Sequence, residues 1–274
     1  MVGTHRPDDT PLLMQTIIPA CIICPHCGSG FIQPTPQGNT ASVQCTHGHR
    51  YPIRSGVIDL LGPPQPESIA AWSNEWRITA WAYERYWRPR SLSILSGQPY
   101  PYARELPAVS AAIPGDAAVI LDLACSNGLY ARTAAQAHPR ATIIGIDRSL
   151  PMLIEAQRRA VEAHLAITYI RADARTLPLA TASVDCTLIG GSLNEMTDLP
   201  RVFAEAARVS TTHATLFSMH LLRNGARSPR VLGLGGITLF GTDEIPTLLR
   251  QTGWQCTAIE HTGIVQLVKG QRTA

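Results

Sequence analysis

Residues 119–132 read Val-Ile-Leu-Asp-Leu-Ala-Cys-Ser-Asn-Gly-Leu-Tyr-Ala-Arg, and this stretch decides the fold. Residues 119–123 form a short apolar run with one acid, which is typical of a buried parallel strand. Residues 124–128 are small or turn-forming, and a helical pattern begins at Leu129. The order of strand, tight turn and helix predicts the start of a nucleotide-binding βαβ unit.

Three further apolar runs predict strands after this turn, at residues 141–146, 166–170 and 184–189. Asp147 closes the first of them about twenty residues after the turn, where a carboxylate accepts two hydrogen bonds from a ribose diol. Asp173 follows the second run and can accept a hydrogen bond from an exocyclic amine. These acids predict a nucleoside site at one edge of a parallel sheet.

Four segments together resemble the class I S-adenosylmethionine-dependent methyltransferases in order and spacing. They are Leu-Asp-Leu-Ala-Cys-Ser-Asn-Gly (121–128), Gly-Ile-Asp-Arg-Ser-Leu-Pro-Met-Leu (145–153), Arg-Ala-Asp-Ala (171–174) and Ser-Val-Asp-Cys-Thr-Leu-Ile-Gly-Gly-Ser-Leu-Asn-Glu (183–195). The resemblance covers roughly residues 105–270. It implies an α/β, Rossmann-like, mostly parallel sheet of seven strands with an antiparallel closing strand, and S-adenosyl-L-methionine as the cofactor.

The resemblance also implies which residues bind that cofactor. They are Asp122, Ala124, Ser126, Gly128, Asp147, Arg148, Asp173, Ala174 and Gly190. Ala124 and Ser126 depart from the family pattern, because glycines are usual at both positions and a Cβ narrows the approach to the methionine moiety. A nicotinamide-dependent Rossmann domain and a methyltransferase fold without activity are the alternatives.

Length and composition indicate one large domain with a small appended one, since the chain has 274 residues of which 45% are hydrophobic. We place the small domain at 17–61, an aromatic-rich helical cap at 67–106 and the methyltransferase domain at 107–274. The net charge of +3 does not by itself indicate nucleic acid. No apolar run is long enough to predict a transmembrane helix. Seven cysteines, an odd number, favour a metal site in a reducing cytoplasm over a disulfide framework.

The small domain carries the pattern of a zinc ribbon. Cys24 and Cys27 form one knuckle, and Cys45 with His49 form a second after seventeen intervening residues, which gives a Cys₃His donor set for Zn²⁺. His47 and Cys21 are alternative ligands. The unit resembles the N-terminal zinc-binding module of bacterial ribosomal-RNA guanine methyltransferases, and residues 50–61 resemble the tail of small zinc-ribbon methyltransferase partners. We expect the metal to stabilise a core of its own, separated from the large domain by the hinge Gly62–Pro66.

The predicted cap holds four of the five tryptophans of the chain, Trp72, Trp76, Trp81 and Trp87. Such rings can grip a flat or lipophilic substrate, or they can simply pack the cap on the core. A glycine- and arginine-rich loop, 221–240, is expected to face the same sheet edge.

The remaining pattern predicts a helix at 199–209, a strand at 214–219, a helix at 243–252 with Thr242 as its N-cap, and a closing antiparallel pair at 254–259 and 264–269. Glu195 and His220 lie at the carboxyl edge and are the candidate catalytic bases, with Asn194 as an orienting hydrogen-bonder.

Two substrate classes fit this layout. The first is a small aromatic or lipophilic metabolite, which we favour. The second is ribosomal RNA, methylated at guanine and docked through the zinc module, where Arg50 and Arg54 are positive but sparse. A non-catalytic cofactor-binding scaffold is a third reading. The acceptor atom and the oligomeric state do not follow from the sequence.

Overall fold

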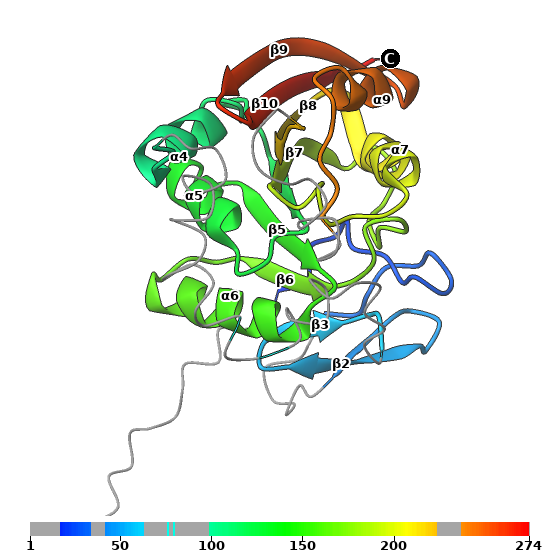
Figure 1. Ribbon diagram of the computed structural model, residues 1–274. Helices are drawn as coiled ribbons and strands as arrows, with labels where there is room; N and C mark the ends of the chain where they lie inside the picture. The colour runs from blue at the N-terminus through cyan, green and yellow to red at the C-terminus, as the bar shows by residue number, and fades with distance from the viewer. Residues whose placement is uncertain are drawn as a thin grey trace, which may run out of the picture.

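The structure is a computed structural model that describes residues 17–33, 42–62, 76, 79, 99–223 and 237–273. Within these residues, the strands form one sheet in the order β1-β2-β3-β6-β5-β4-β7-β8-β10-β9 (Figure 1). The strands are β1 (Ser42–Gln44), β2 (Arg50–Arg54), β3 (Val57–Asp59), β4 (Val119–Leu123), β5 (Thr142–Asp147), β6 (Thr168–Arg171), β7 (Val184–Gly190), β8 (Ser210–Leu221), β9 (Trp254–Thr262) and β10 (Val265–Arg272). The helices are α4 (Tyr102–Ser110), α5 (Leu129–Ala137), α6 (Leu150–Glu162), α7 (Leu199–Val209) and α9 (Glu244–Gln251).

The predicted Rossmann-like sheet is confirmed. Strands β6, β5, β4, β7 and β8 are parallel neighbours, and β10 lies antiparallel between β8 and β9. The order in which strands are added to the sheet reverses at β4: the chain adds β5 and β6 on one side of β4 and then β7 and β8 on the other. In open sheets of this kind, ligands bind at the carboxyl ends of the strands next to such a reversal.

Local patterns predicted most element boundaries. Strand β4 and helix α7 have the predicted bounds, and Ser149 caps α6 by accepting a hydrogen bond from the Met152 backbone N–H at 3.3 Å. Two expectations are corrected. Strand β8 is longer than predicted, because Ser210 at its start pairs with Val184 of β7 and His220 and Leu221 at its end pair with β10. The N-cap position of α9 is Asp243, because its carbonyl accepts the first helical hydrogen bond, from the Thr247 N–H at 2.9 Å, whereas the carbonyl of Thr242 accepts one from Gln266.

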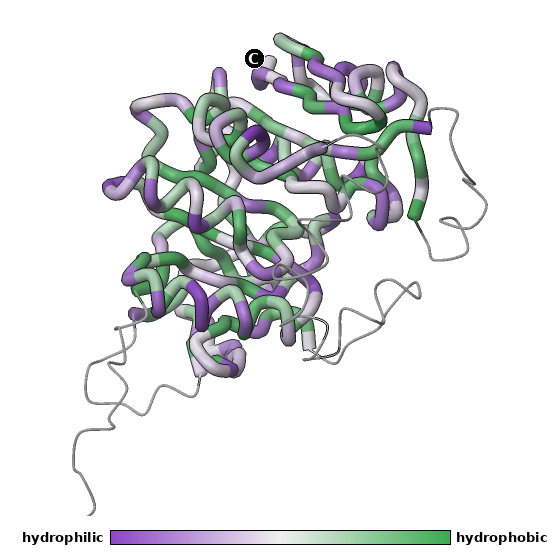
Figure 2. Tube along the Cα trace, turned by 60° about the vertical axis from the view of Figure 1, so that its left-hand side comes forward, coloured by the Kyte–Doolittle hydropathy of each residue, from purple (hydrophilic) through white to green (hydrophobic). Residues whose placement is uncertain are grey.

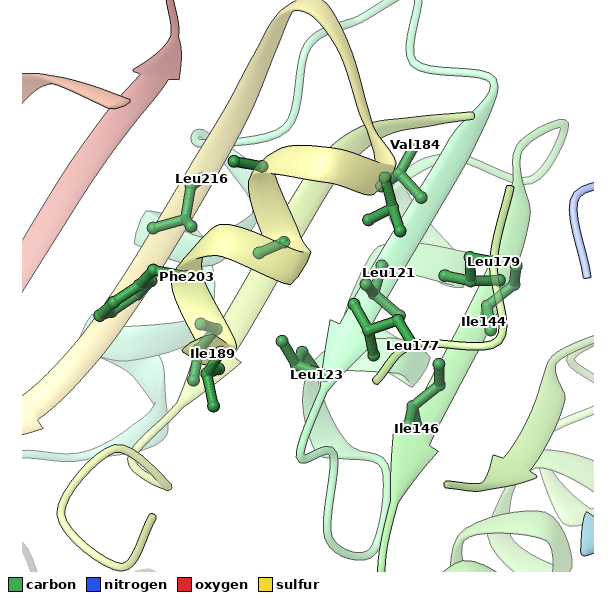
Figure 3. Packing of buried hydrophobic residues seen from close by; sticks show 14 of the residues in the cluster. Leu121, Leu123, Ile144, Ile146, Leu177, Leu179, Val184, Ile189, Phe203 and Leu216 are labelled. Carbon is green, nitrogen blue, oxygen red and sulfur yellow. The ribbon is translucent and has the colours of Figure 1, made fainter. Parts of the chain in front are cut away.

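Side chains from the sheet form a core on each of its two faces, because alternate residues of a strand point in opposite directions. Leu121 and Ile144 point to the face covered by α7 and α9, which we call the α7 face (Figure 3). Ile120 and Ile143 point to the face covered by α4, α5 and α6, the α5 face (Figure 1). Figure 2 shows the hydrophobic stretches running through the interior strands and the more hydrophilic ones on the outer turns.

The small N-terminal unit joins this sheet, and the expectation of a separate core is corrected. Strand β3 pairs in parallel with β6, and the β2–β3 hairpin extends the sheet beyond it (Figure 1). Ile18, Ile22 and Ile58 are buried in the same cluster as Leu121 of β4. Sequence periodicity alone does not reveal which sheet edge a short strand will join. The domain boundaries proposed above remain a prediction.

Across the part of the chain that the structure describes, every helix is too short or too polar to cross a bilayer.

Candidate functional site

The turn between β4 and α5 is held in a left-handed backbone conformation that residues other than glycine rarely adopt. The φ angles are 54° at Ala124, 50° at Ser126 and 75° at Gly128. A left-handed conformation costs an L-residue about 1–2 kcal/mol, and such strain is concentrated at functional sites. Gly128 is required for a second reason, since a Cβ there would collide with the hydroxyl of Tyr169. The predicted departure from the glycine pattern is therefore accommodated by backbone strain.

Asp147 lies at the end of β5 and faces this turn. Its Oδ2 accepts a hydrogen bond from the Ser126 backbone N–H at 2.7 Å, and its Oδ1 accepts one from the Ser149 N–H at 2.9 Å. Desolvation raises the pKa of this carboxyl group above its ordinary value, although the backbone hydrogen bonds oppose the shift. The backbone N–H of Arg148 also stabilises the charged form of Asp147. A carboxylate has about four lone-pair sites, so acceptor capacity remains, as a ribose diol would require.

A small pocket lies beside the turn. Its lining residues are Asp122, Ala124, Cys125, Ser126, Asn127, Leu129, Tyr130 and Gly190. Asp122 is 1% exposed and accepts a hydrogen bond from the Ala131 N–H at 2.8 Å. Desolvation raises its pKa to about 7, the hydrogen bond from Ala131 opposes this, and the charge of Asp147 adds to it. Gly190 leaves room for the ring of Tyr130, which a Cβ would meet at 2.8 Å.

The predicted cofactor residues did not include the side chains of Tyr130 and Asn127, which also line the pocket. Tyr130 is buried at the start of α5, and its hydroxyl donates to the buried carboxylate of Glu105 at 2.5 Å. Asn127 is 2% exposed, and its Nδ2 has no hydrogen-bond partner in the described parts of the chain. A buried donor without a partner is costly, so this amide is available to an acceptor on a ligand or to a bound water. The sequence signal that could have identified them was their position: Asn127 lies inside the turn, and Tyr130 is the second residue of α5.

Asp173 is held by a neighbouring arginine. Oδ1 accepts from the backbone N–H and the Nε of Arg175 at 2.9 and 3.0 Å, and Oδ2 accepts from its Nη2 at 2.7 Å. Desolvation would raise the pKa of Asp173, but the hydrogen bonds and charge of Arg175 outweigh it and lower the pKa. Only Oδ2 retains a free lone pair for an exocyclic amine. Arg148 and Ala174 are partly exposed beside Asp147 and Asp173, respectively.

The two candidate bases do not line the pocket. Glu195 is exposed in the turn after β7. His220 is fully buried on β8, where its Nε2 lies 2.6 Å from the Oε1 of Gln266 and its ring packs edge-on against Phe240. Gln266 donates its amide N–H to the Thr242 carbonyl, so its oxygen faces His220 and Nε2 carries the proton. Desolvation lowers the pKa of His220 to about 4, despite the hydrogen bond of Gln266.

Asn194 has a structural role at the base of the loop predicted at 221–240. Its Oδ1 accepts from the Leu221 N–H at 2.8 Å, and its Nδ2 donates to the carbonyls of Leu221 and Thr238 at 3.0 and 2.6 Å. It therefore ties the two ends of this loop together. Residues 224–236 lie outside the described residues, as do Trp72, Trp81, Trp87 and most of the predicted cap; Trp76 is exposed.

The four predicted metal ligands converge at the N-terminal end of the sheet. The ligand atoms of Cys24, Cys27, Cys45 and His49 all lie within 4.8 Å of one another. The Sγ atoms of Cys27 and Cys45 are 3.8 Å apart, and the His49 Nδ1 is 3.3 Å from Cys45 Sγ and 3.7 Å from Cys24 Sγ. Tetrahedral Zn²⁺ with Zn–S bonds of about 2.3 Å places sulfur atoms roughly 3.8 Å apart, so the donor set fits this ion.

Neighbouring groups support the cluster. The hydroxyls of Tyr51 and Ser29 lie 3.1 and 3.0 Å from Cys24 Sγ and Cys27 Sγ, and the His49 N–H donates to Cys45 Sγ at 3.3 Å. Such contacts orient metal ligands. Cys21 and His47, the alternatives that the spacing left open, are not in the cluster.

Comparisons with known proteins agree with this geometry. Residues 120–212 match the family model described as a methyltransferase domain. Among curated proteins, a malonyl-[acyl-carrier protein] O-methyltransferase of Xylella fastidiosa is 35% identical over 52% of this chain and 41% of its own length. A 2-phytyl-1,4-naphtoquinone methyltransferase of Synechococcus elongatus is 34% identical over 40% and 49%. A tRNA (guanine-N(7)-)-methyltransferase of Chloroflexus aggregans is 33% identical over 47% and 49%.

A solved structure shares the fold over more of the chain. It is described as the complex between the Haloferax volcanii Trm112 methyltransferase activator and the putative methyltransferase, and it matches with a TM-score of 0.58 at 14% identity, over 77% of this chain and 100% of that chain. The alignments with the curated relatives span between 27% and 49% of the length of those relatives.

Proposed function

We propose that this chain, which carries a class I S-adenosylmethionine-dependent methyltransferase domain, methylates a small aromatic or lipophilic metabolite. The observation that carries the proposal is the strained turn 124–128 facing Asp147, with the buried, unpartnered amide of Asn127 beside it. These groups are suited to a ligand that has a ribose diol and further acceptor groups.

The residues around the turn would hold S-adenosylmethionine as follows. The free lone pairs of Asp147 accept the two ribose hydroxyls, and the free lone pair of Asp173 Oδ2 accepts an exocyclic amine hydrogen. Asn127 Nδ2 donates to an acceptor on the cofactor, and Asp122, buried beside it, supports the start of α5 through the Ala131 N–H. The cofactor supplies a methyl group on a positively charged sulfur.

The part left to the protein is alignment and exclusion of water. His220 is neutral at pH 7, and its Nδ1 is a buried lone pair without a partner among the described residues. It would accept a hydrogen bond only from an O–H or N–H group of a substrate that reaches the α7 face. Glu195 is exposed. We therefore propose that transfer depends mainly on positioning the acceptor, and that His220 and Glu195 are secondary candidates for a base.

Two observations favour a small acceptor over RNA. The named relatives include enzymes of a naphthoquinone and of an acyl carrier, although a tRNA enzyme is also among them. In the N-terminal unit, Arg54 is engaged by Asp59 at 3.0 Å, so one of the two cations expected to meet phosphates is already partly neutralised. The ribosomal-RNA reading therefore rests on little more than the shape of the unit.

We also propose that the Cys₃His cluster binds one Zn²⁺. The distances among its donors support this assignment, and the ion would be structural because all four tetrahedral positions are filled by protein ligands.

A single labelling experiment tests the acceptor class. Purified protein and S-adenosylmethionine with a radiolabelled methyl group are added to cell extract, with and without prior nuclease treatment. We expect label in the organic-extractable fraction, unaffected by nuclease and reduced in the Asp147→Ala variant. Nuclease-sensitive label that falls when Arg50 and Arg54 are replaced would establish the RNA alternative. No label in any fraction would favour a non-catalytic scaffold.

A further inference from the structure

Arg171 is a buried cation at the junction of the N-terminal unit and the cofactor edge. It is the last residue of β6 and is 2% exposed. Strand β6 lies between β3 and β5, and Arg171 is the register partner of Asp59 on one side and of Asp147 on the other. A buried guanidinium requires partners for its charge and for its N–H groups.

On the side of the N-terminal unit, the partner of Arg171 is Asp59. The Nη1 of Arg171 lies 3.4 Å from both carboxylate oxygens of Asp59, which is 4% exposed, and it also donates to the carbonyl of Gly62. The Asp59 carboxylate in turn accepts hydrogen bonds from Arg54 Nε and from the backbone N–H groups of Leu61 and Gly62. This network fixes the guanidinium relative to β3.

On the cofactor side, Arg171 orients one particular peptide group. Its Nε donates to the carbonyl of Arg148 at 2.8 Å. The same peptide unit contains the Ser149 N–H, which donates to Asp147 Oδ1. Arg171 and Asp147 therefore bind the two ends of a single peptide plane. A rotation of that plane would remove the Ser149 hydrogen bond, one of the backbone hydrogen bonds that orient the carboxylate.

We propose that Arg171 is a positioning residue for Asp147, and that Asp59 makes this positioning depend on the N-terminal unit. The inference rests on the proposed function, because it concerns how well Asp147 receives a ribose diol. Affinity for the cofactor is then set partly by residues of β3, which lie outside the methyltransferase motifs.

Arg171→Lys is the main test variant. Lysine keeps a cation for Asp59 but lacks the Nε donor and the rigid fork of arginine, so the contact with the Arg148 carbonyl is lost. Asp59→Asn keeps an acceptor of the same shape and removes the charge. Arg272→Lys is the matched control, because Arg272 lies at the end of β10, away from Asp147. It likewise donates to backbone carbonyls, those of Ala207 and Gly253 at 3.1 and 2.8 Å.

Each variant is titrated by calorimetry with two ligands: S-adenosylhomocysteine, and an analogue that lacks both ribose hydroxyls. We expect Arg171→Lys to weaken S-adenosylhomocysteine about three- to tenfold, as the loss of one well-aimed hydrogen bond would. Affinity for the analogue should stay within about twofold of wild type. Asp59→Asn should show a smaller loss of the same pattern, the double variant should be no weaker than Arg171→Lys, and Arg272→Lys should match wild type.

The outcomes separate this inference from the proposed function. Unchanged binding of S-adenosylhomocysteine by Arg171→Lys, or an equal loss for both ligands, would overturn the positioning role while Asp147→Ala still weakens binding. Additive losses in the double variant would overturn the role of Asp59. If wild-type protein does not bind S-adenosylhomocysteine, the proposed function fails and this inference fails with it.

Discussion

The Cys₃His cluster and the carboxyl edge of the sheet are two polar sites built in opposite ways. At the cluster, four electron-pair donors lie within 4.8 Å of one another, an arrangement that becomes stable when a cation is bound. At the edge, Asp122 and Asp147 already accept backbone hydrogen bonds from the chain itself. If the cluster binds zinc as proposed, we expect it to depend on that ion for its stability, whereas the carboxyl edge is already ordered by hydrogen bonds from the chain itself.

The two sites are nevertheless joined by the sheet. Strand β2 begins directly after His49 and forms a hairpin with β3, and β3 pairs with β6. Changes at one site are therefore expected to be felt at the other, and the four predictions below test how far that holds.

The largest effect is expected when the metal ligands are removed. Cys24→Ser together with Cys27→Ser should abolish zinc binding, as measured by elemental analysis of protein purified without added metal. Structural zinc contributes on the order of 10 kcal/mol in isolated zinc modules, so the melting temperature should fall by roughly ten degrees or more. Because Ile18, Ile22 and Ile58 share the core of the α7 face, we expect one broadened calorimetric transition for the whole chain.

Cys21→Ser is the control for that experiment, because Cys21 lies outside the cluster, and this variant should retain a full equivalent of zinc. A double variant that retains its zinc would disprove the ligand assignment. An unchanged melting temperature of the large domain would show that the two regions are energetically independent after all.

The second effect concerns pH at the edge. The folded-state pKa of Asp122 is raised to about 7 from an ordinary value of 3.8, so its contribution to stability is fully present below about pH 4 and is lost as the pH rises through about 7. Asp122→Asn keeps the acceptor for the Ala131 N–H and cannot ionise. Urea unfolding at pH 4.5, 6 and 8 should show a decline in stability that is about 2–4 kcal/mol larger in wild type than in the variant, which keeps only the smaller contribution of Asp147 and other groups. If the unfolding free energies of wild type and Asp122→Asn instead change in parallel with pH, the ionisation of Asp122 does not destabilise the folded state.

A third effect is expected on ligand affinity alone. Asp147→Ala removes the proposed acceptor for both ribose hydroxyls, which should cost roughly 1–3 kcal/mol of binding free energy. Calorimetric titration should show S-adenosylhomocysteine binding weakened by about tenfold or more, with zinc content unchanged. Unaltered affinity would remove Asp147 from the site, and a loss of zinc would reveal coupling in the reverse direction.

The smallest effect comes from relieving strain in the turn. Ala124→Gly should stabilise the fold by about 0.5–1 kcal/mol, because φ is 54° at Ala124 and glycine adopts that angle without a steric cost. Chemical denaturation measures this directly. Ala117→Gly, at a buried residue outside the positive-φ positions, is the matched control and should destabilise. Destabilisation by Ala124→Gly would show that the Cβ at 124 makes contacts worth more than the strain.

Features encoded by neighbouring residues were predictable. The bounds of β4 and α7 and the four converging cysteine and histidine donors follow from local patterns: an apolar run, a helical period and a cysteine spacing. Asp147 and Asp173 also lie where they were predicted, at the end of β5 and just after β6, because parallel strands have their carboxyl ends at one edge of the sheet. The assignment of each acid to a particular group of the cofactor stays a prediction.

Features that depend on distant residues were not predictable. His220 ends a strand, which suggested an accessible base, yet Gln266 and Phe240 enclose it from segments far along the chain. Tyr130 and Asn127 entered the pocket because Gly190 of β7 and the turn after β4 come together only in the folded sheet.

The sequence by itself thus determined the βαβ unit and the Cys₃His donor set, since each is encoded in one short stretch of the chain, residues 119–147 for the unit and 24–49 for the donors. Only the tertiary structure decided that β3 would join the edge of β6 and that Asp59 would meet Arg171, 112 positions later in the chain. The physical reason is that an edge strand offers unpaired N–H and C=O groups to any strand that reaches it, and a buried charge must find its partner wherever the fold brings one.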